Sequence, residues 1–366
     1  MSVLFEKTAI NGMELVNRFV RSATWEGLAA EDGAVTPRLV DAMRTLAEGR
    51  VGLIITGHAY VRPEGQAGPW QLGAYKDELI PGLKQMTGAV HDAGGRIVLQ
   101  LAHAGTFASE TRTGKTPWAV SVPQGQSRNP RREMTVQDIQ DVVTAFANGA
   151  RRAKEAGFDG VQIHSAHGYL LSQFLSPAFN RREDAYGGNL KNRSRIHLEV
   201  CRAVREAVGE SYPLLIKMNC RDFADNGLEL EDSIEAIQGL EASGLDAMEL
   251  SGGLVTGGKL SPSRPGITSE AQEAFFREEA RAFRQKIRIP LILVGGVRSF
   301  GVAETLVQEG VADYISMSRP LIREPDLIQR WKEGDRQRAA CNSDNLCFGP
   351  GMKGEGVYCV TKERET

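Results

Sequence analysis

The sequence predicts an α/β fold of the (β/α)8 TIM-barrel class, and three observations support this prediction. Eight short runs of apolar, often β-branched residues alternate with eight amphipathic segments along the 366-residue chain. Three amphipathic segments end at a glycine just before the next apolar run, at Gly157, Gly244 and Gly310, as helices commonly do. A doubly wound open sheet is the alternative, but no G-x-G-x-x-G follows the first apolar run, which weakens a dinucleotide-binding sheet.

The elements follow one another in a regular order. Asn11-Gly12 separates two short apolar runs, so residues 3–17 are predicted to form a β-hairpin that closes one end of the barrel. Thr135 with Asp138 three residues later indicates a capping box at the start of one helix. The predicted strands are residues 19–23, 51–57, 96–102, 160–164, 214–219, 247–251, 291–295 and 312–318. The predicted helices are residues 37–48, 82–93, 136–156, 193–208, 230–243, 270–286, 299–309 and 324–332.

Composition and charge limit the classes of protein to which the chain can belong. The 44 basic and 46 acidic side chains give a net charge of −2, so neither nucleic acid nor an anionic membrane is an expected partner. No apolar run is long enough to span a bilayer, and the first residues lack the features of a signal peptide. Five cysteines in a chain of this length do not form a disulfide framework, which favours a reducing, cytoplasmic setting. We expect one domain over residues 1–366, with residues 334–366 as a cysteine-containing extension.

Polar side chains gather where the fourth predicted strand ends. Val161 and Ile163 alternate with polar residues up to His164, and His167 and Tyr169 follow within a few positions. Two imidazoles can donate hydrogen bonds to one substrate oxygen, and a phenol can supply a proton nearby. A metal-binding histidine pair, or hydrogen-bonded polar groups at a strand end, are the alternatives.

The whole stretch from Gly160 to Pro177 resembles the H-x-x-[HN]-G-Y-L-L-x-Q-F-L-x-P signature of the old yellow enzyme family of flavin-dependent ene-reductases. The resemblance extends over about residues 3–360 and implies bound FMN and a ping-pong reaction. NADH or NADPH would reduce the flavin, and an enone or enoate-type small molecule would then be reduced at its C=C bond. The resemblance implies that His164 and His167 hold the substrate carbonyl and that Tyr169 is the proton donor. Relatives lead us to expect a homo-oligomer.

The other predicted strand ends carry residues suited to a flavin. The resemblance implies flavin contacts from Ser22, Ala23, Thr24, Trp25 and Gln100, and backbone contacts from Gly57 or His58. Loops after the last two strands commonly bind phosphate in such barrels, which points to Gly295, Gly296, Ser318 and Arg319. Residues 104–134 are predicted to be an insertion that shapes access to the barrel mouth.

Lys217 ends the fifth predicted strand inside an apolar run, where a charged group needs an anionic partner. The resemblance places its counterpart near flavin N1 and O2. The alternative is a Schiff-base lysine of a non-redox barrel aldolase.

Two further segments carry family-like patterns. Residues 180–193 resemble an N-x-R-x-D-x-Y-G-G loop, for which we expect a structural role. Near the end, Cys341, Cys347 and Cys359 resemble the [4Fe–4S] segment of the dienoyl-CoA reductase branch, but Asp344 stands near the position of a fourth cysteine. We favour a lost cluster; three thiolates with Asp344 holding a cluster or zinc ion is the alternative, and with it an electron-transfer subunit. The FAD and NAD domains of that branch are expected to be missing after Thr366.

Overall fold

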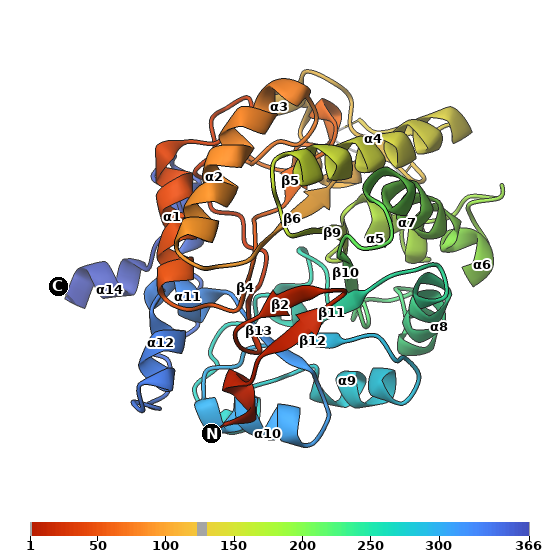
Figure 1. Cartoon of the computed structure of the whole chain (residues 1–366). Coiled ribbons are helices and arrows are strands. Elements are labelled where there is room, and N and C mark those ends of the chain that lie inside the picture. The colour runs from red at the N-terminus through yellow and green to blue at the C-terminus, as the bar shows by residue number, and fades with distance from the viewer. Residues whose placement is uncertain (1, 123–129, 366) are drawn as a thin grey trace.

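The computed structural model describes residues 2–122 and 130–365 and confirms the predicted barrel (Figure 1). Within these ranges, eight parallel strands pair in the order β3, β4, β6, β9, β10, β11, β12 and β13, and β13 pairs back to β3, which closes the sheet. The strands are Phe19–Arg21 (β3), Leu53–Ile55 (β4), Ile97–Ala102 (β6), Gly160–Ser165 (β9), Leu214–Asn219 (β10), Ala247–Ser251 (β11), Leu291–Val294 (β12) and Tyr314–Met317 (β13).

The main helices surround the barrel because each of them turns an apolar stripe toward the outer face of the strands. The predicted capping box is present, since Thr135 Oγ1 accepts from the Asp138 N–H and Asp138 accepts from the Thr135 N–H. The main helices are Pro37–Glu48 (α1), Ile80–Asp92 (α2), Val136–Glu155 (α4), Arg195–Val208 (α7), Leu230–Glu241 (α8), Arg277–Arg284 (α9), Phe300–Gln308 (α10) and Leu327–Lys332 (α12). The short ones are Glu110–Thr113 (α3), Leu170–Leu175 (α5), Leu190–Arg193 (α6), Arg319–Arg323 (α11), Phe348–Gly351 (α13) and Val360–Glu365 (α14).

Two predicted helices have the wrong boundaries. Residues 270–286 do not form one helix, because the chain leaves the short 3-10 turn Glu270–Gln272 so that Glu273 can accept hydrogen bonds from the Arg298 and Ser299 N–H groups. The helix predicted from residue 324 begins at Leu327, since Glu324 precedes a proline and takes a non-helical conformation.

The predicted N-terminal hairpin is present and closes the barrel end that faces the viewer in Figure 1. It consists of Thr8–Ile10 (β1) and Met13–Leu15 (β2). Ile10, Met13 and Leu15 are buried in a second apolar core, together with Val20 and Leu53 from the barrel interior. The hairpin therefore fills this end of the barrel interior, and the strands finish at the opposite end.

Short strands outside the barrel were not predicted. Ala59–Tyr60 (β5) extends the sheet beside β6, and Trp118–Ala119 (β7) pairs with Arg132–Glu133 (β8) inside the predicted insertion. Residues 123–129 of that insertion lie outside the described residues.

None of the helices in the described ranges is both long and apolar enough to cross a membrane.

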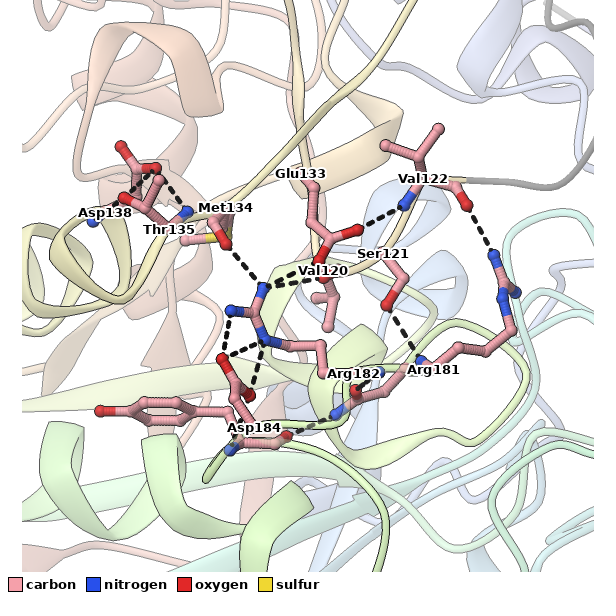
Figure 2. Close-up of polar contacts among 12 residues, drawn as sticks. Val120, Ser121, Val122, Glu133, Met134, Thr135, Asp138, Arg181, Arg182 and Asp184 are labelled. Carbon is pink, nitrogen blue, oxygen red and sulfur yellow. Dashed lines mark hydrogen bonds and ion pairs between the residues drawn. The ribbon is translucent and has the colours of Figure 1, made fainter.

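Arg182, in the loop after α5, binds the residues that directly follow β7 and β8 (Figure 2). Its guanidinium donates to the Val120 and Met134 carbonyls, at 3.1 and 2.6 Å, and pairs with Asp184 at 2.6 Å. Arg181 adds a 2.8 Å hydrogen bond to the Val122 carbonyl. These contacts support the structural role predicted for residues 180–193.

Candidate active site

A pocket opens at the carboxyl ends of the barrel strands and contains most of the predicted site residues. Ser251, Pro262, Ser263 and Phe348 also line it and were not predicted. The predicted residues in its wall are Ser22, Ala23, Thr24, Trp25, His58, Gln100, His164, His167, Tyr169, Lys217 and Ser318. A smaller cavity, lined by Gly295, Gly296, Arg298, Ser318 and Arg319, shares Pro262, Ser263, Val294 and Ser318 with it.

Gly57 is the exception, and its predicted flavin contact is not supported. Its N–H donates to Glu26 Oε1 at 3.1 Å and its carbonyl accepts from Thr56 Oγ1 at 2.9 Å. A side chain at this position would also collide with Glu26, whose Oε2 lies 2.2 Å from the place of a Cβ atom. Gly57 therefore packs against Glu26 and does not line the pocket.

His164, His167 and Tyr169 form one cluster. The centroid of the His164 ring lies 5.4 Å from that of the His167 ring and 4.8 Å from that of the Tyr169 ring. Burial, together with Lys217 and the neighbouring histidines, holds the pKa of both histidines well below the ordinary value. Both imidazoles are therefore neutral at pH 7, and each has one N–H to donate.

Neighbouring residues fix the orientation of His167. Its backbone has a φ of +65°, which is unusual for a residue with a side chain, and its N–H donates to Asn219 Oδ1 at 3.1 Å. Its Nε2 lies 2.8 Å from Ser251 Oγ, and this hydrogen bond links the ring to the end of β11. His164 Nδ1, by contrast, is buried and has no partner among the described residues.

Tyr169 and His58 complete the wall beside the histidines. Burial raises the pKa of Tyr169 to about 12, so the phenol keeps its proton throughout the neutral range. The His58 ring lies 5.4 Å from Tyr169, and burial lowers the pKa of His58 to about 4. Gln71 Nε2 lies 2.6 Å from His58 Nδ1 and holds this ring in place.

Lys217 has an anionic partner that sequence reasoning missed. Its Nζ lies 3.1 Å from Glu249 Oε1 and donates to Ser22 Oγ at 2.7 Å. Glu249 is opposite Lys217 in the register of β10 and β11, so both side chains point into the barrel. The sequence did contain a signal for this ion pair, because Lys217 and Glu249 occupy equivalent positions near the ends of neighbouring predicted strands. The ion pair uses the lysine as a cation, whereas a Schiff base requires the neutral amine.

Glu249 organises several pocket residues at once. Ser22 Oγ, Ser316 Oγ and Gln162 Nε2 donate to its carboxylate at 2.7, 2.8 and 3.0 Å. Gln100 Nε2 donates in turn to Gln162 Oε1 at 2.7 Å. Burial raises the pKa of Glu249, but Lys217 and these donors outweigh burial and keep the pKa below the ordinary value. The carboxylate is therefore ionised and holds its donors in fixed positions.

A second buried carboxylate, Glu26, lies behind the part of the pocket wall that follows β3, residues 22–25. Burial raises its pKa to about 7, although Arg21 and the Gly57 N–H act in the opposite direction. Arg21 also donates to the Ser22 carbonyl and to Thr24 Oγ1, and Thr24 Oγ1 lies 2.6 Å from Ser318 Oγ. Glu26 and Arg21 thus support the wall that reaches from the pocket to the smaller cavity.

The smaller cavity has the features of a phosphate site. Gly296 has a φ of +81°, and Arg298 and Arg319 are only 2% and 7% exposed. Sequence reasoning missed Arg298, although an arginine two residues after the Gly-Gly pair could have suggested it. Two buried guanidinium groups next to glycine backbone form a suitable environment for a dianion.

The cysteine segment places its thiols and Asp344 among different partners. Cys341 and Cys347 are buried, whereas Cys359 Sγ lies 3.7 Å from an Arg323 nitrogen and Asp344 accepts from Thr361 Oγ1 at 2.6 Å. In the described part of the chain, no three histidine, cysteine or acidic side chains are arranged to hold a metal ion. Because Asp344 stands near the position of the fourth cysteine and is bound to Thr361, a lost cluster stays our prediction for this segment.

Comparisons with known proteins show the family and the fold. The profile of the NADH:flavin oxidoreductase / NADH oxidase family matches residues 3–338. An NADH oxidase of Thermoanaerobacter brockii is 36% identical over 98% of the chain, which spans 58% of that protein. The fold matches an old yellow enzyme homologue from Zymomonas mobilis over 98% of both chains, with a TM-score of 0.80 and 26% identity. It matches a 2-naphthoyl-CoA reductase with a TM-score of 0.91 and 26% identity, over 98% of this chain and 56% of that one.

Proposed function

Because the chain belongs to the NADH:flavin oxidoreductase / NADH oxidase family and is of the old yellow enzyme type, we propose that it is an FMN-dependent NAD(P)H oxidoreductase that reduces the C=C bond of α,β-unsaturated carbonyl compounds. The observation that carries this proposal is the neutral His164–His167 pair beside a protonated Tyr169, in one pocket with a phosphate-suited cavity. The chain spans 58% of the length of the NADH oxidase and 56% of that of the 2-naphthoyl-CoA reductase. The activity of the whole protein is therefore a proposal.

The residues present fit FMN. Ser22 to Trp25, Gln100 and Lys217 line the pocket and would surround the flavin ring, and the buried His164 Nδ1, which has no partner among the described residues, supports a polar ligand here. Gly295, Gly296, Arg298, Ser318 and Arg319 would hold the phosphate. When bound, FMN supplies the hydride chemistry that links nicotinamide oxidation to substrate reduction.

The protein's own part in the reaction is to bind, orient and protonate. The neutral His164 and His167 would each direct one N–H to the substrate carbonyl oxygen and stabilise the negative charge that develops there. Ser251 and the Asn219 contact keep the His167 ring in place before substrate arrives. Tyr169 Oη would then give its proton to the substrate α-carbon, which is possible because burial keeps this phenol protonated.

Lys217 and Glu249 would set the charge next to the flavin. A lysine without a partner would add a full positive charge at the pocket, whereas the 3.1 Å pair reduces that charge and fixes the direction of the ammonium N–H bonds. The pair therefore favours a neutral ligand surface with well-placed donors, such as the edge of an oxidised flavin ring.

An absorbance experiment tests the proposed function. The purified protein is expected to show flavin bands that bleach with anaerobic NADH or NADPH and return on addition of 2-cyclohexenone. A colourless protein that does not take up added FMN would refute the flavin assignment. Bleaching without recovery by any enone or enoate would refute the ene-reductase assignment and leave another electron acceptor to be found.

A further inference from the structure

We propose that Ser343 and Asn345 position the two arginines of the phosphate cavity, so that the cysteine segment acts as a clamp for the FMN phosphate instead of a cluster site. By the clamp we mean Ser343 and Asn345. This inference rests on the proposed function, because it concerns the phosphate of the same cofactor. It assigns a task to residues that sequence reasoning connected only with a metal cluster.

Each residue of the clamp binds one arginine. Ser343 Oγ accepts from Arg298 Nη2 at 3.1 Å, and Asn345 Oδ1 accepts from Arg319 Nη1 at 2.6 Å. Arg298 Nε remains buried with no partner among the described residues. The clamp therefore fixes one arm of each guanidinium and leaves other N–H groups for a ligand.

The clamp supplies position without supplying charge. Neither Arg298 nor Arg319 has a carboxylate within ion-pair distance in the described part of the chain, and both are nearly fully buried. Burial lowers the pKa of Arg298 to about 10 and also lowers the pKa of Arg319. Ser343 and Asn345 hold these cations through neutral hydroxyl and amide acceptors, and burial outweighs the nearby Cys341 and acidic groups, so both arginines gain from an incoming dianion.

The same residues also fasten the loop over the cavity. Asn345 Nδ2 donates to the Ser263 carbonyl at 2.7 Å, and the Gly266 N–H donates to the Ser343 carbonyl at 3.1 Å. Ser263 lines both the main pocket and the smaller cavity. The clamp thus joins three segments that are far apart in the sequence, namely the ends of β12 and β13 and the loop after β11.

The backbone of the clamp is unusual. Ser343 has a φ of +62° and Asn345 a φ of +63°, a conformation that costs energy for residues with a side chain and persists only where the surroundings enforce it. Between them, Asp344 turns outward to Thr361. This alternation sends the side chains of Ser343 and Asn345 to the two arginines and removes Asp344 from any shared ligand set with Cys341 and Cys347.

Binding of FMN and of riboflavin to the apoprotein, followed by quenching of flavin fluorescence, tests the clamp. Asn345→Gly removes the side chain while allowing the positive φ, and we expect FMN to bind about tenfold more weakly, as for the loss of one charge-assisted hydrogen bond. Riboflavin has no phosphate, so its affinity is expected to stay unchanged. Asn226→Gly is the matched control, because Asn226 also has a positive φ, of +52°, is exposed and lines neither cavity, and both affinities should equal those of the wild type.

Asn345→Asp provides a second variant of nearly the same shape that also tolerates a positive φ. It would pair with Arg319 and neutralise it, so FMN should again bind more weakly and riboflavin should not. Equal weakening of FMN and riboflavin, or no change of either in both variants, would overturn the clamp. If the wild-type apoprotein binds neither flavin, the proposed function itself fails.

Discussion

Replacing the buried Glu26 by glutamine is expected to stabilise the protein at neutral and higher pH. The pKa of Glu26 rises from an ordinary value near 4.5 to about 7 on folding, because its burial disfavours the charged form. Between these two pKa values the folded state keeps a proton that the unfolded state has released. Folding stability therefore falls as pH rises through this window, and the loss is complete above about pH 7.

The magnitude follows from the size of the shift. About 2.5 pKa units at 1.36 kcal/mol each correspond to about 3 kcal/mol. Glutamine imitates the protonated carboxyl group and can still accept the hydrogen bond from the Gly57 N–H. Glu26→Gln should therefore match the wild type near pH 4 and exceed its free energy of unfolding by up to about 3 kcal/mol at pH 8.

Urea unfolding of the apoprotein at several pH values between 2 and 8.5 would measure this difference. Asp138→Asn is a control of opposite sign, because the Arg132 side chain holds the pKa of Asp138 at about 2. That stabilisation is present above the ordinary pKa and is lost as pH falls, so this variant should be weaker at pH 7 and approach the wild type near pH 2. A difference for Glu26→Gln that stays constant with pH, or that has the opposite sign, would refute the assignment of a raised pKa.

Three further substitutions test other parts of the site and its support. Tyr169→Phe should slow enone reduction about 100-fold in stopped flow, while flavin reduction by NAD(P)H stays near the wild-type rate. Equal rates of enone reduction in the variant and the wild type would show that Tyr169 is not the proton donor. Glu249→Gln should leave Lys217 without its counter-charge and raise the flavin midpoint potential measured by dye equilibration, and an unchanged potential would contradict the charge-balancing role. Arg182→Ala should leave the Val120 and Met134 carbonyls without their donor and lower the free energy of unfolding by about 2 kcal/mol or more. Its flavin affinity should not change, because Arg182 does not line the pocket.

The barrel was predictable because its signals are local. Each strand is a short apolar run, and the glycines that end the helices have positive φ values where the sequence placed them, as at Gly157 and Gly310. The helix predicted at 270–286 was wrong because Glu273 binds backbone groups at the end of another strand, which no local pattern reveals.

The site was predictable where a motif or a strand end marked it. His164, His167 and Tyr169 belong to one continuous motif, and the structure brings their rings together. Gly57 follows a strand in the same way, but its backbone groups are used by Glu26 and Thr56. Asn345 could not be found, because its importance depends on contacts with residues 26 and 82 positions away in the chain.

Closure of the barrel has a consequence for synthesis of the chain. β3 at Phe19–Arg21 pairs with β13 at Tyr314–Met317, so one edge of the earliest barrel strand stays open until nearly 300 more residues exist. At about 5 to 20 residues per second, a ribosome needs roughly 15 to 60 s to make them. During that time the apolar residues of β3 and of the hairpin below it lack their final neighbours, which makes this N-terminal region the natural substrate of chaperones that meet the nascent chain.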